Sequence, residues 1–296
     1  MSAPIPAEPP PLDGGSRRLW CDLIRGRLGI DLGRDGPNLQ DGFLRRRLWS
    51  RMRTLEIGTY GDYLDRVRGG GDEWERLVDL LVVPESRFFR HGPTFDALMT
   101  RVLPALCDRR PEQGIHMMSI GCARGQEAYS LAMAAHRVLG PDAGVRVTGT
   151  DVSRSALDSA RRGVYTAAEV REALRRHCEH YLAPIAGTTA RSRRYRVREI
   201  IRRIVRFRLA DLRERDPGES ATADLVFCQN VLIYFLRKDR AEALAALLER
   251  LRPGGYLFLA PGELVGATVV GARLVPFAET LCYRRRKEAV HVQIVD

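Results

Sequence analysis

The stretch that decides the fold is "IHMMSIGCARGQEAYSLAMAAHRVLG", residues 115–140. A short apolar run is followed by a glycine-containing turn and then by an amphipathic helical pattern. Residues 145–163, "VRVTGTDVSRSALDSARRG", repeat the order with an apolar run, an acid at its end and a serine-capped helix. Alternation of strand and helix predicts a parallel β-sheet with helices on both faces.

Two further stretches extend this pattern. Residues 223–235, "ADLVFCQNVLIYF", read as a third buried strand, and residues 239–260, "DRAEALAALLERLRPGGYLFLA", as a helix, a Pro-Gly-Gly turn and a fourth strand. Ligand sites in such sheets lie at the carboxyl ends of the strands. The pattern places Gly121, Gly125, Asp151 and Asn230 at those ends.

The N-terminal part of the chain has a different pattern. Residues 1–15 are Pro-rich and are predicted to be a disordered lead, and residues 19–80 read as helices without a β pattern. Leu44, Leu48 and Met52 fall on one face of a helix, while Arg46 and Arg53 fall on the opposite face. We predict a small helical domain.

A basic segment interrupts the alternation of strand and helix. Residues 191–212, "RSRRYRVREIIRRIVRFRLADL", contain alternating stretches with a basic face, which predict two or three short antiparallel strands. The window 161–208 holds 14 arginines against 4 glutamates, within a chain of net charge +11. Such an excess indicates an anionic partner, which could be nucleic acid, an acidic lipid surface or an acidic protein.

Composition narrows the class of protein. The 296 residues are 45% hydrophobic and 29% charged, as in a soluble globular protein, and no apolar run approaches the roughly 20 residues that span a bilayer. The N-terminus lacks the apolar region of a signal peptide. The six cysteines are scattered without a Cys-x-x-Cys pair, which predicts buried thiols in a reducing cytoplasm and no metal site.

The glycine turn at 121–125 gives the first indication of chemistry. Glycines let a ligand approach the backbone, and the helix that follows presents free N–H groups. The turn alone is a weak signal, because it matches neither a dinucleotide fingerprint nor a phosphate loop. Asp151 at the end of the next strand strengthens it, since an acid there can accept both hydroxyls of a ribose.

Together these features resemble class I S-adenosylmethionine-dependent methyltransferases. Within that superfamily, the chain from about Leu19 to Tyr283 resembles the chemoreceptor glutamate methyltransferases of the CheR family, nearer to members of alternative chemosensory systems. The resemblance rests on "ESRFFR", "GCARGQEAYSLAM", "GTDVSRSALDSARRGVY", "FCQNVLIYF" and "LRPGGYLFLAPGE", in the family's order and spacing.

The resemblance implies an α/β fold and a division into domains. We expect a class I methyltransferase Rossmann-like sheet at residues 93–288 with a small antiparallel β-lobe at about 181–208, preceded by a helical substrate-recognition domain at 16–92. It also implies methylation of glutamate carboxylates on the cytoplasmic helices of a chemoreceptor, with S-adenosylmethionine as cofactor and S-adenosylhomocysteine as product. The enzyme is expected to be a cytoplasmic monomer without nucleic acid or membrane insertion.

The resemblance also implies roles for individual residues. In the family, the loop before the paired phenylalanines closes over the cofactor, and the arginine after them lies beside the reacting methyl group, which is Arg90 here. Tyr234 is expected to face that methyl group, and Arg46 and Arg53 to bind the receptor. The positions expected to contact the cofactor are Ser86, Arg90, Gly121, Ala123, Glu127, Asp151, Asp211, Leu212, Gln229 and Asn230.

Departures from the family pattern and two alternatives remain. Pro84 stands where many members have asparagine, Gln229 where many have arginine, and "PGE" at 261–263 where many have His-Ser-Glu. One alternative is an RNA or small-molecule methyltransferase on the same fold. The other is a non-catalytic adaptor that binds S-adenosylmethionine as a signal.

Overall fold

The computed structural model of the protein describes residues 8–32, 42–109, 114–176, 178–186, 193–214, 223–264 and 267–294. The chain forms two compact units. One comprises Met1–Val83 together with Ile233–Asp239, and the other comprises Pro84–Leu232 together with Arg240–Asp296. No helix of the described residues is both long and apolar enough to cross a membrane.

The first unit is helical, as predicted. Its helices are α1 (Gly14–Leu28), α2 (Gly42–Thr54), α3 (Tyr60–Arg68) and α4 (Asp72–Leu81). Leu44, Leu48 and Met52 of α2 are buried, whereas Arg46 and Arg53 are exposed. The predicted apolar and basic faces of this helix are therefore confirmed.

The start of the chain needs a correction. Asp13 caps α1 by accepting the backbone N–H groups of Gly15 and Ser16, each at 2.9 Å. The Tyr60 hydroxyl donates to the carbonyl of Pro10 at 2.9 Å. Because these contacts hold the chain from Pro10 onward, the disordered lead predicted for residues 1–15 does not include residues 10–15. Residues 1–7 lie outside the described residues.

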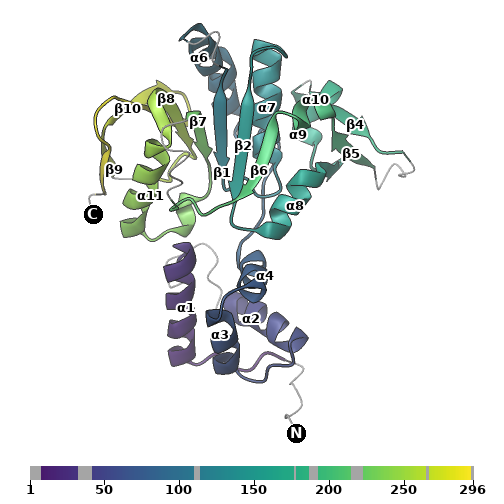
Figure 1. The fold of residues 1–296 in the computed structure, drawn as a ribbon, viewed down its shortest axis with the longest axis vertical. Helices are drawn as coiled ribbons and strands as arrows, with labels where there is room; N and C mark the ends of the chain where they lie inside the picture. Colours follow the sequence, from purple (N-terminus) through teal and green to yellow (C-terminus); the bar gives the residue numbers. More distant parts are fainter. Residues whose placement is uncertain are drawn as a thin grey trace. The chain divides into compact units, whose positions relative to one another are not determined.

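The second unit contains a mixed seven-stranded sheet in the order β10-β11-β8-β7-β1-β2-β6 (Figure 1). The five strands from β8 to β6 are parallel, β11 runs antiparallel to β8, and β10 runs antiparallel to β11. This confirms the class I methyltransferase sheet with its α/β architecture. The strands are β1 (His116–Ile120), β2 (Arg146–Asp151), β6 (Val205–Leu209), β7 (Ala223–Cys228), β8 (Leu251–Leu259), β10 (Ala272–Phe277) and β11 (Thr280–Arg285).

The strand order reverses between β1 and β7. Helix α7 (Gln126–Leu139) carries the chain from β1 to β2, and α11 (Arg237–Glu249) carries it from β7 to β8 in the opposite direction along the sheet. Because parallel crossovers are right-handed, the two helices pack on opposite faces. Ligands of open α/β sheets bind at such a reversal, which lies here at the carboxyl ends of β1 and β7.

The remaining elements surround this sheet. A two-stranded antiparallel sheet pairs β9 (Ala267–Val270) with β12 (His291–Ile294). The shorter helical segments are α5 (Gly92–Ala97), the π-helix η1 (Leu98–Val102), α6 (Leu103–Arg109), α8 (Arg154–Arg162), α9 (Arg171–Arg175), η2 (Glu179–Tyr181), α10 (Glu199–Arg202) and η3 (Leu232–Tyr234).

The predicted β-lobe exists but has different strands. It is a three-stranded antiparallel sheet in the order β3-β5-β4, formed by β3 (Val164–Thr166), β4 (Leu182–Pro184) and β5 (Arg194–Val197). Residues 205–209, which were assigned to the lobe, form the edge strand β6 of the main sheet, and β3 lies before the predicted bounds of 181–208. Residues 187–192 lie outside the described residues.

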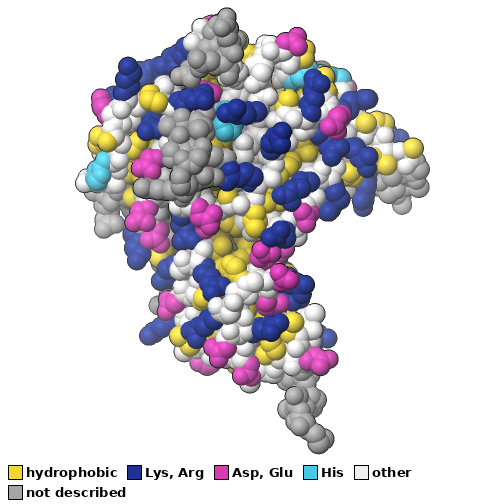
Figure 2. All heavy atoms as spheres, in the orientation of Figure 1, with side chains coloured by type: hydrophobic (Ala, Val, Ile, Leu, Met, Phe, Trp, Pro, Cys, Tyr) yellow, Lys and Arg dark blue, Asp and Glu magenta, His cyan; other side chains and the backbone are white. Residues whose placement is uncertain are grey.

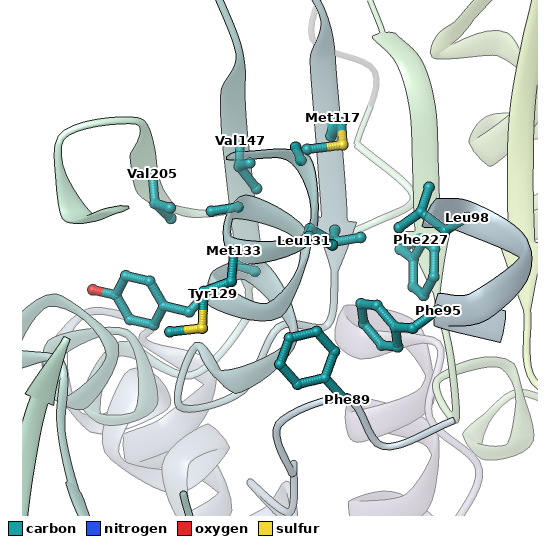
Figure 3. Packing of buried hydrophobic residues seen from close by; sticks show 14 of the residues in the cluster. Phe89, Phe95, Leu98, Met117, Tyr129, Leu131, Met133, Val147, Val205 and Phe227 are labelled. Atoms are coloured by element: carbon teal, nitrogen blue, oxygen red, sulfur yellow. The ribbon is translucent and has the colours of Figure 1, made fainter. Parts of the chain in front are cut away.

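The boundary between the units is also earlier than predicted. The units divide between Val83 and Pro84, and not at residues 92 and 93. The reason is that Phe88 and Phe89 belong to the core of the second unit, together with Phe95, Leu98 and Phe227. Figure 3 shows Phe89 directed toward Phe95 and helix α7 within this core.

A buried acid organises the helical unit. Both carboxylate oxygens of Glu73 accept from Arg51, at 2.9 and 2.6 Å, and one also accepts from the Tyr63 hydroxyl at 2.9 Å. Burial would raise the pKa of Glu73, but the hydrogen bonds from Arg51 and Tyr63 outweigh it, so the pKa lies below its usual value. The charged form of Glu73 is thus the stabilising form.

We predict that Glu73→Gln destabilises the helical unit by about 2–4 kcal/mol, because it leaves the Arg51 guanidinium without its countercharge. Urea unfolding followed by tryptophan fluorescence measures this, since all three tryptophans, Trp20, Trp49 and Trp74, lie in this unit. Asp65→Asn, which removes an exposed acid paired with Arg68, is the control and should change stability by less than about 0.5 kcal/mol. Equal midpoints for the two variants would contradict the assigned role.

Candidate functional site

Two adjacent phenylalanines anchor the loop that begins the second unit. Phe88 and Phe89 have exposed fractions of 0% and 2%. Phe88 meets the ring of Tyr165 edge-on at 5.0 Å, and Phe89 meets Phe95 at 4.9 Å. The backbone of Phe89 is left-handed, with φ of 50°, and its N–H donates to the Ser130 hydroxyl at 2.9 Å. The strained backbone is thus fixed by a helix of the core.

The two buried phenylalanines fix the backbone position of the next residue, Arg90. Arg90 follows the left-handed residue, is exposed, and donates to the carbonyl of Glu85 at 3.4 Å. Burial raises the pKa of the Glu127 carboxylate, and the positive charge of Arg90 opposes that increase. Ser86 lies in the same loop and is partly buried. The structure therefore brings Arg90 within electrostatic reach of the glycine turn.

The glycine turn follows β1 and is held by an acid of the neighbouring strand. Ala123 has φ of 48°, and its N–H donates to Asp151 Oδ2 at 2.8 Å. The other oxygen of Asp151 accepts the N–H of Ser153 at 2.9 Å. A side chain at Gly121 is excluded, because a Cβ there would lie 2.4 Å from the side chain of Val231. Asp151 thus fixes the turn through its carboxylate.

A second turn, after β7, is held by Glu263. Asn230 has φ of 61°, and the N–H groups of Val231 and Leu232 donate to Glu263 Oε1 at 2.9 and 3.0 Å. Glu263 Oε2 accepts the N–H of Ala260 at 2.8 Å. Burial raises the pKa of Glu263, while these backbone donors lower it. Sequence analysis did not single out Glu263, although its place after a buried strand in "LFLAPGE" is the signal that could have found it.

Glu127 is the most perturbed acid of the site. Its carboxylate accepts the Ser119 hydroxyl at 2.7 Å. Part of its side chain remains accessible, but protein surrounds the carboxylate, and burial raises its pKa to about 7. The hydroxyl and Arg90 lower the pKa, whereas the negative charge of Glu263 raises it. Titration near neutral pH is typical of functional sites.

Asp211 and Leu212 follow β6, the strand next to β2. Leu212 is buried, and Asp211 forms an ion pair with Arg213 at 2.7 Å while accepting the Arg213 backbone N–H at 2.8 Å. Together with Gly121, Asp151 and Asn230, these residues lie at or just beyond the carboxyl ends of four adjacent parallel strands. The predicted cofactor positions therefore share one edge of the sheet.

The site contains buried side-chain oxygens that accept no hydrogen bond from the described protein. Among the described residues, none donates to three buried side-chain oxygens, which are Gln126 Oε1, Gln229 Oε1 and Asn230 Oδ1. The amide nitrogen of Gln229 is engaged, at 3.4 Å from both Thr94 Oγ1 and the carbonyl of Leu259. Buried acceptors without partners are costly, so a ligand that brings N–H donors or positive charge satisfies them. S-adenosylmethionine, with an ammonium and a sulfonium, fits this set.

Three of the predicted residues belong to the helical unit. Arg46 and Arg53 lie on α2, with no ion-pair partner among the described residues. Tyr234 lies in the stretch Ile233–Asp239, and its carbonyl accepts the N–H of Asp31 at 2.8 Å. Their roles stay predictions. The described residues contain no group of three or more His, Cys, Asp or Glu that could hold a metal ion.

Two family models match the chain. The one described as "CheR methyltransferase, all-alpha domain" matches residues 17–82, and the one described as "CheR methyltransferase, SAM binding domain" matches residues 84–273. The point where one match ends and the other begins coincides with the division between the two compact units.

Curated relatives agree with these matches. "Chemotaxis protein methyltransferase 1" of Pseudomonas aeruginosa is 32% identical over 268 residues, which cover 87% of this chain and 93% of the relative. "Probable biofilm formation methyltransferase WspC" of the same species is 30% identical over 276 residues, which cover 90% of this chain and 61% of the relative. "Chemotaxis protein methyltransferase" of Salmonella typhimurium is 28% identical, over 85% of this chain and 84% of the relative.

We predict that Glu127→Gln stabilises the ligand-free protein at pH 8 by about 1–3 kcal/mol and has little effect at pH 4. The folded state keeps the proton of Glu127 up to about pH 7, whereas an unfolded glutamate loses it near its ordinary value of 4.5. Between these values the folded state binds more protons, so wild-type stability falls as pH rises. Thermal unfolding at both pH values measures the difference.

Glu199→Gln is the matched control for this prediction, since Glu199 is an exposed acid paired with Arg202. It should shift the unfolding temperature little at either pH. A Glu127→Gln variant that is less stable than wild type at pH 8 would show that the buried charge is favourable and would contradict the prediction.

Proposed function

Because the chain belongs to the CheR methyltransferase family, we propose that it methylates glutamate carboxylates on the cytoplasmic helices of a chemoreceptor. The membership confirms the family, the fold class and the S-adenosylmethionine cofactor predicted from the sequence. The observation that supports the proposal is the set of buried side-chain oxygens without donors at the carboxyl ends of the strands, in the unit whose first loop carries Arg90 on a buried aromatic anchor.

When bound, S-adenosylmethionine supplies a methyl group on a cationic sulfur. An oxygen of the glutamate carboxylate forms the new bond to the methyl carbon while the carbon–sulfur bond breaks, which yields a methyl ester and S-adenosylhomocysteine. The ordinary pKa of a glutamate side chain lies well below 7, so the carboxylate is already ionised at neutral pH and no general base is required. The protein's contribution is therefore positioning and exclusion of water.

Each residue of the site has a proposed task within this reaction. Asp151 holds the ribose hydroxyls, Glu127 lies against the cofactor at the glycine turn, and Asp211 and Leu212 border the adenine. Asn230 and Gln229 line the methyl-donor end. Arg90 orients the incoming carboxylate, Tyr234 shapes the methyl pocket, and Ser86 contacts the cofactor from the loop.

The alternative of an RNA methyltransferase loses support from the packing of two aromatic residues. RNA-binding surfaces stack bases on exposed aromatic side chains. Tyr195 and Phe207, which lie in the basic segment, both pack against the hydrophobic core, and Phe207 meets Tyr129 at 5.4 Å. Figure 2 shows Lys and Arg side chains spread over the visible face of the protein. In the described part of the basic segment, the arginines have no fully exposed aromatic side chain beside them on which a base could stack. An acidic protein is the better partner. Because the proposed substrate is the cytoplasmic part of a chemoreceptor, the proposal also assigns the enzyme to the cytoplasm.

Transfer of a labelled methyl group to a receptor cytoplasmic fragment tests the proposed function. The expected product releases its label as methanol under mild base, which is the signature of a methyl ester. A base-stable product, or label on RNA in place of the receptor, would overturn the proposal.

We predict that Arg90→Ala lowers turnover by on the order of 10²-fold while it weakens S-adenosylhomocysteine binding far less, because its task is to orient the carboxylate. Arg87→Ala is the matched control, since Arg87 is an exposed neighbour paired with Glu85. Single-turnover kinetics and calorimetry measure the two quantities. Equal losses in both would make Arg90 a cofactor contact, and unchanged turnover would remove it from the site.

We further predict that charge reversal of Arg46 and Arg53 lowers receptor methylation at low salt without changing affinity for S-adenosylhomocysteine. Methylation regions are rich in glutamate, so exposed arginines of α2 would steer and dock an acidic helix. Added salt should lower wild-type activity in the same way. The control reverses Arg18 and Arg66, which are exposed on other helices of the same unit and give the same change in net charge. Equal activity of the two double variants would contradict docking by α2.

A further inference from the structure

Tyr165 of β3 contacts the glycine turn from the small sheet. Its side chain is 1% exposed, and its hydroxyl donates to the carbonyl of Arg124 at 2.6 Å. Arg124 lies between Ala123 and Gly125, so this hydrogen bond reaches the middle of the turn. Burial raises the pKa of the Tyr165 hydroxyl well above its usual value, and the group therefore stays a protonated donor.

The same segment also holds the side chain of Arg124. Its guanidinium pairs with Glu169 Oε1 at 2.6 Å, and Glu169 Oε2 accepts both the N–H and the hydroxyl of Thr166 at 2.8 Å. Residues 165–169 thus contact Arg124 twice, with a hydrogen bond to its carbonyl and an ion pair with its guanidinium. Among the described residues, no other segment forms side-chain hydrogen bonds with both the carbonyl and the guanidinium of Arg124.

The ring of Tyr165 contacts the aromatic anchor as well. It meets Phe88 edge-on at 5.0 Å with an interplanar angle of 85°, and Tyr129 at 6.3 Å. One buried side chain therefore contacts both the turn that follows β1 and the loop that carries Arg90. These two segments are the ones that the cofactor and the incoming carboxylate are proposed to share.

We propose that Tyr165 is a positioning residue for methyl transfer, which holds the glycine turn through its hydroxyl and the Arg90 loop through its ring. The inference rests on the proposed function, because it concerns the same site. Ala123 and Phe89 both have left-handed backbones, with φ of 48° and 50°, and such conformations persist only where the surroundings enforce them. Tyr165 hydrogen-bonds the residue after Ala123 and packs against the residue before Phe89, so it contacts both strained segments.

The hydroxyl and the ring have separable effects. Loss of the hydroxyl leaves the Arg124 carbonyl without its donor, so the turn adopts the binding-competent conformation in a smaller fraction of the molecules. The apparent affinity for the cofactor falls in proportion to that fraction. Loss of the ring also frees Phe88, and with it the loop that aims Arg90. The first change acts on cofactor affinity, and the second also acts on turnover at saturating cofactor.

Tyr165→Phe tests the hydroxyl, with Tyr129→Phe as the matched control. The Tyr129 side chain is also 1% exposed, and its hydroxyl donates to a backbone carbonyl, that of Ala160 at 2.9 Å, which is outside the turn. We expect Tyr165→Phe to weaken S-adenosylhomocysteine binding roughly tenfold and to raise the KM for the cofactor, with kcat nearly unchanged. Tyr129→Phe should lower the unfolding temperature to a similar extent with less than about a twofold effect on binding.

Tyr165→Leu tests the ring and should lower kcat at saturating cofactor in addition. Glu169→Gln removes the negative charge that pairs with the Arg124 guanidinium and should weaken binding in the same direction as Tyr165→Phe. If Tyr165→Leu does not fold, the two conservative variants still decide the proposal.

Equal binding by Tyr165→Phe and Tyr129→Phe would overturn the proposal, because a merely structural role predicts no difference between them. A wild-type protein that does not bind S-adenosylhomocysteine would instead overturn the proposed function. The two failures are therefore distinguishable in one calorimetric series.

Discussion

Hydrogen bonding to two left-handed turns is the constraint on which the site depends. The turns follow β1 and β7, at the point where the strand order reverses, and both contain a non-glycine residue with positive φ. Such turns leave backbone N–H groups that the sheet cannot pair. Asp151 accepts from one turn and Glu263 from the other, so each carboxylate substitutes for the hydrogen bonds that regular structure would supply. The same carboxylates add negative charge at this edge of the sheet, so the groups that hold the turns also favour a cationic ligand.

The charge distribution separates two recognition tasks. The chain has a net charge of +11, yet the site at the carboxyl ends of the strands contains Glu127, Glu263 and side-chain oxygens without donors. The acidic and oxygen-rich site favours a cationic ligand, whereas the excess of basic residues over the whole chain favours an acidic partner. Arg90 is exposed, and its positive charge opposes the increase that burial causes in the pKa of Glu127. A residue in that position suits a reaction that joins an anionic side chain to a cationic donor.

Much of this arrangement could be predicted from the sequence, and the exceptions have physical reasons. Local patterns predicted β1, β2, β7 and β8 and the turn residues after them, because each element carries its own periodicity and its own glycine or acid. They assigned residues 205–209 to the wrong sheet, since alternation shows that a segment is a strand but not which strand it pairs with. Glu263 and Tyr165 were missed because their partners are distant in sequence. The paired phenylalanines, Phe88 and Phe89, were singled out only through the family resemblance.

The discontinuous helical unit has a consequence for synthesis. Ile30 pairs with Phe235 in an antiparallel bridge, and the N–H of Asp31 donates to the carbonyl of Tyr234. A ribosome releases the four N-terminal helices first, but these contacts form only after the intervening strands have been made. The nascent helical unit therefore lacks residues 233–239 until most of the parallel sheet has been synthesised. Contacts of such long sequence separation form late, and expression of residues 1–83 alone would yield a domain that lacks one of its own segments.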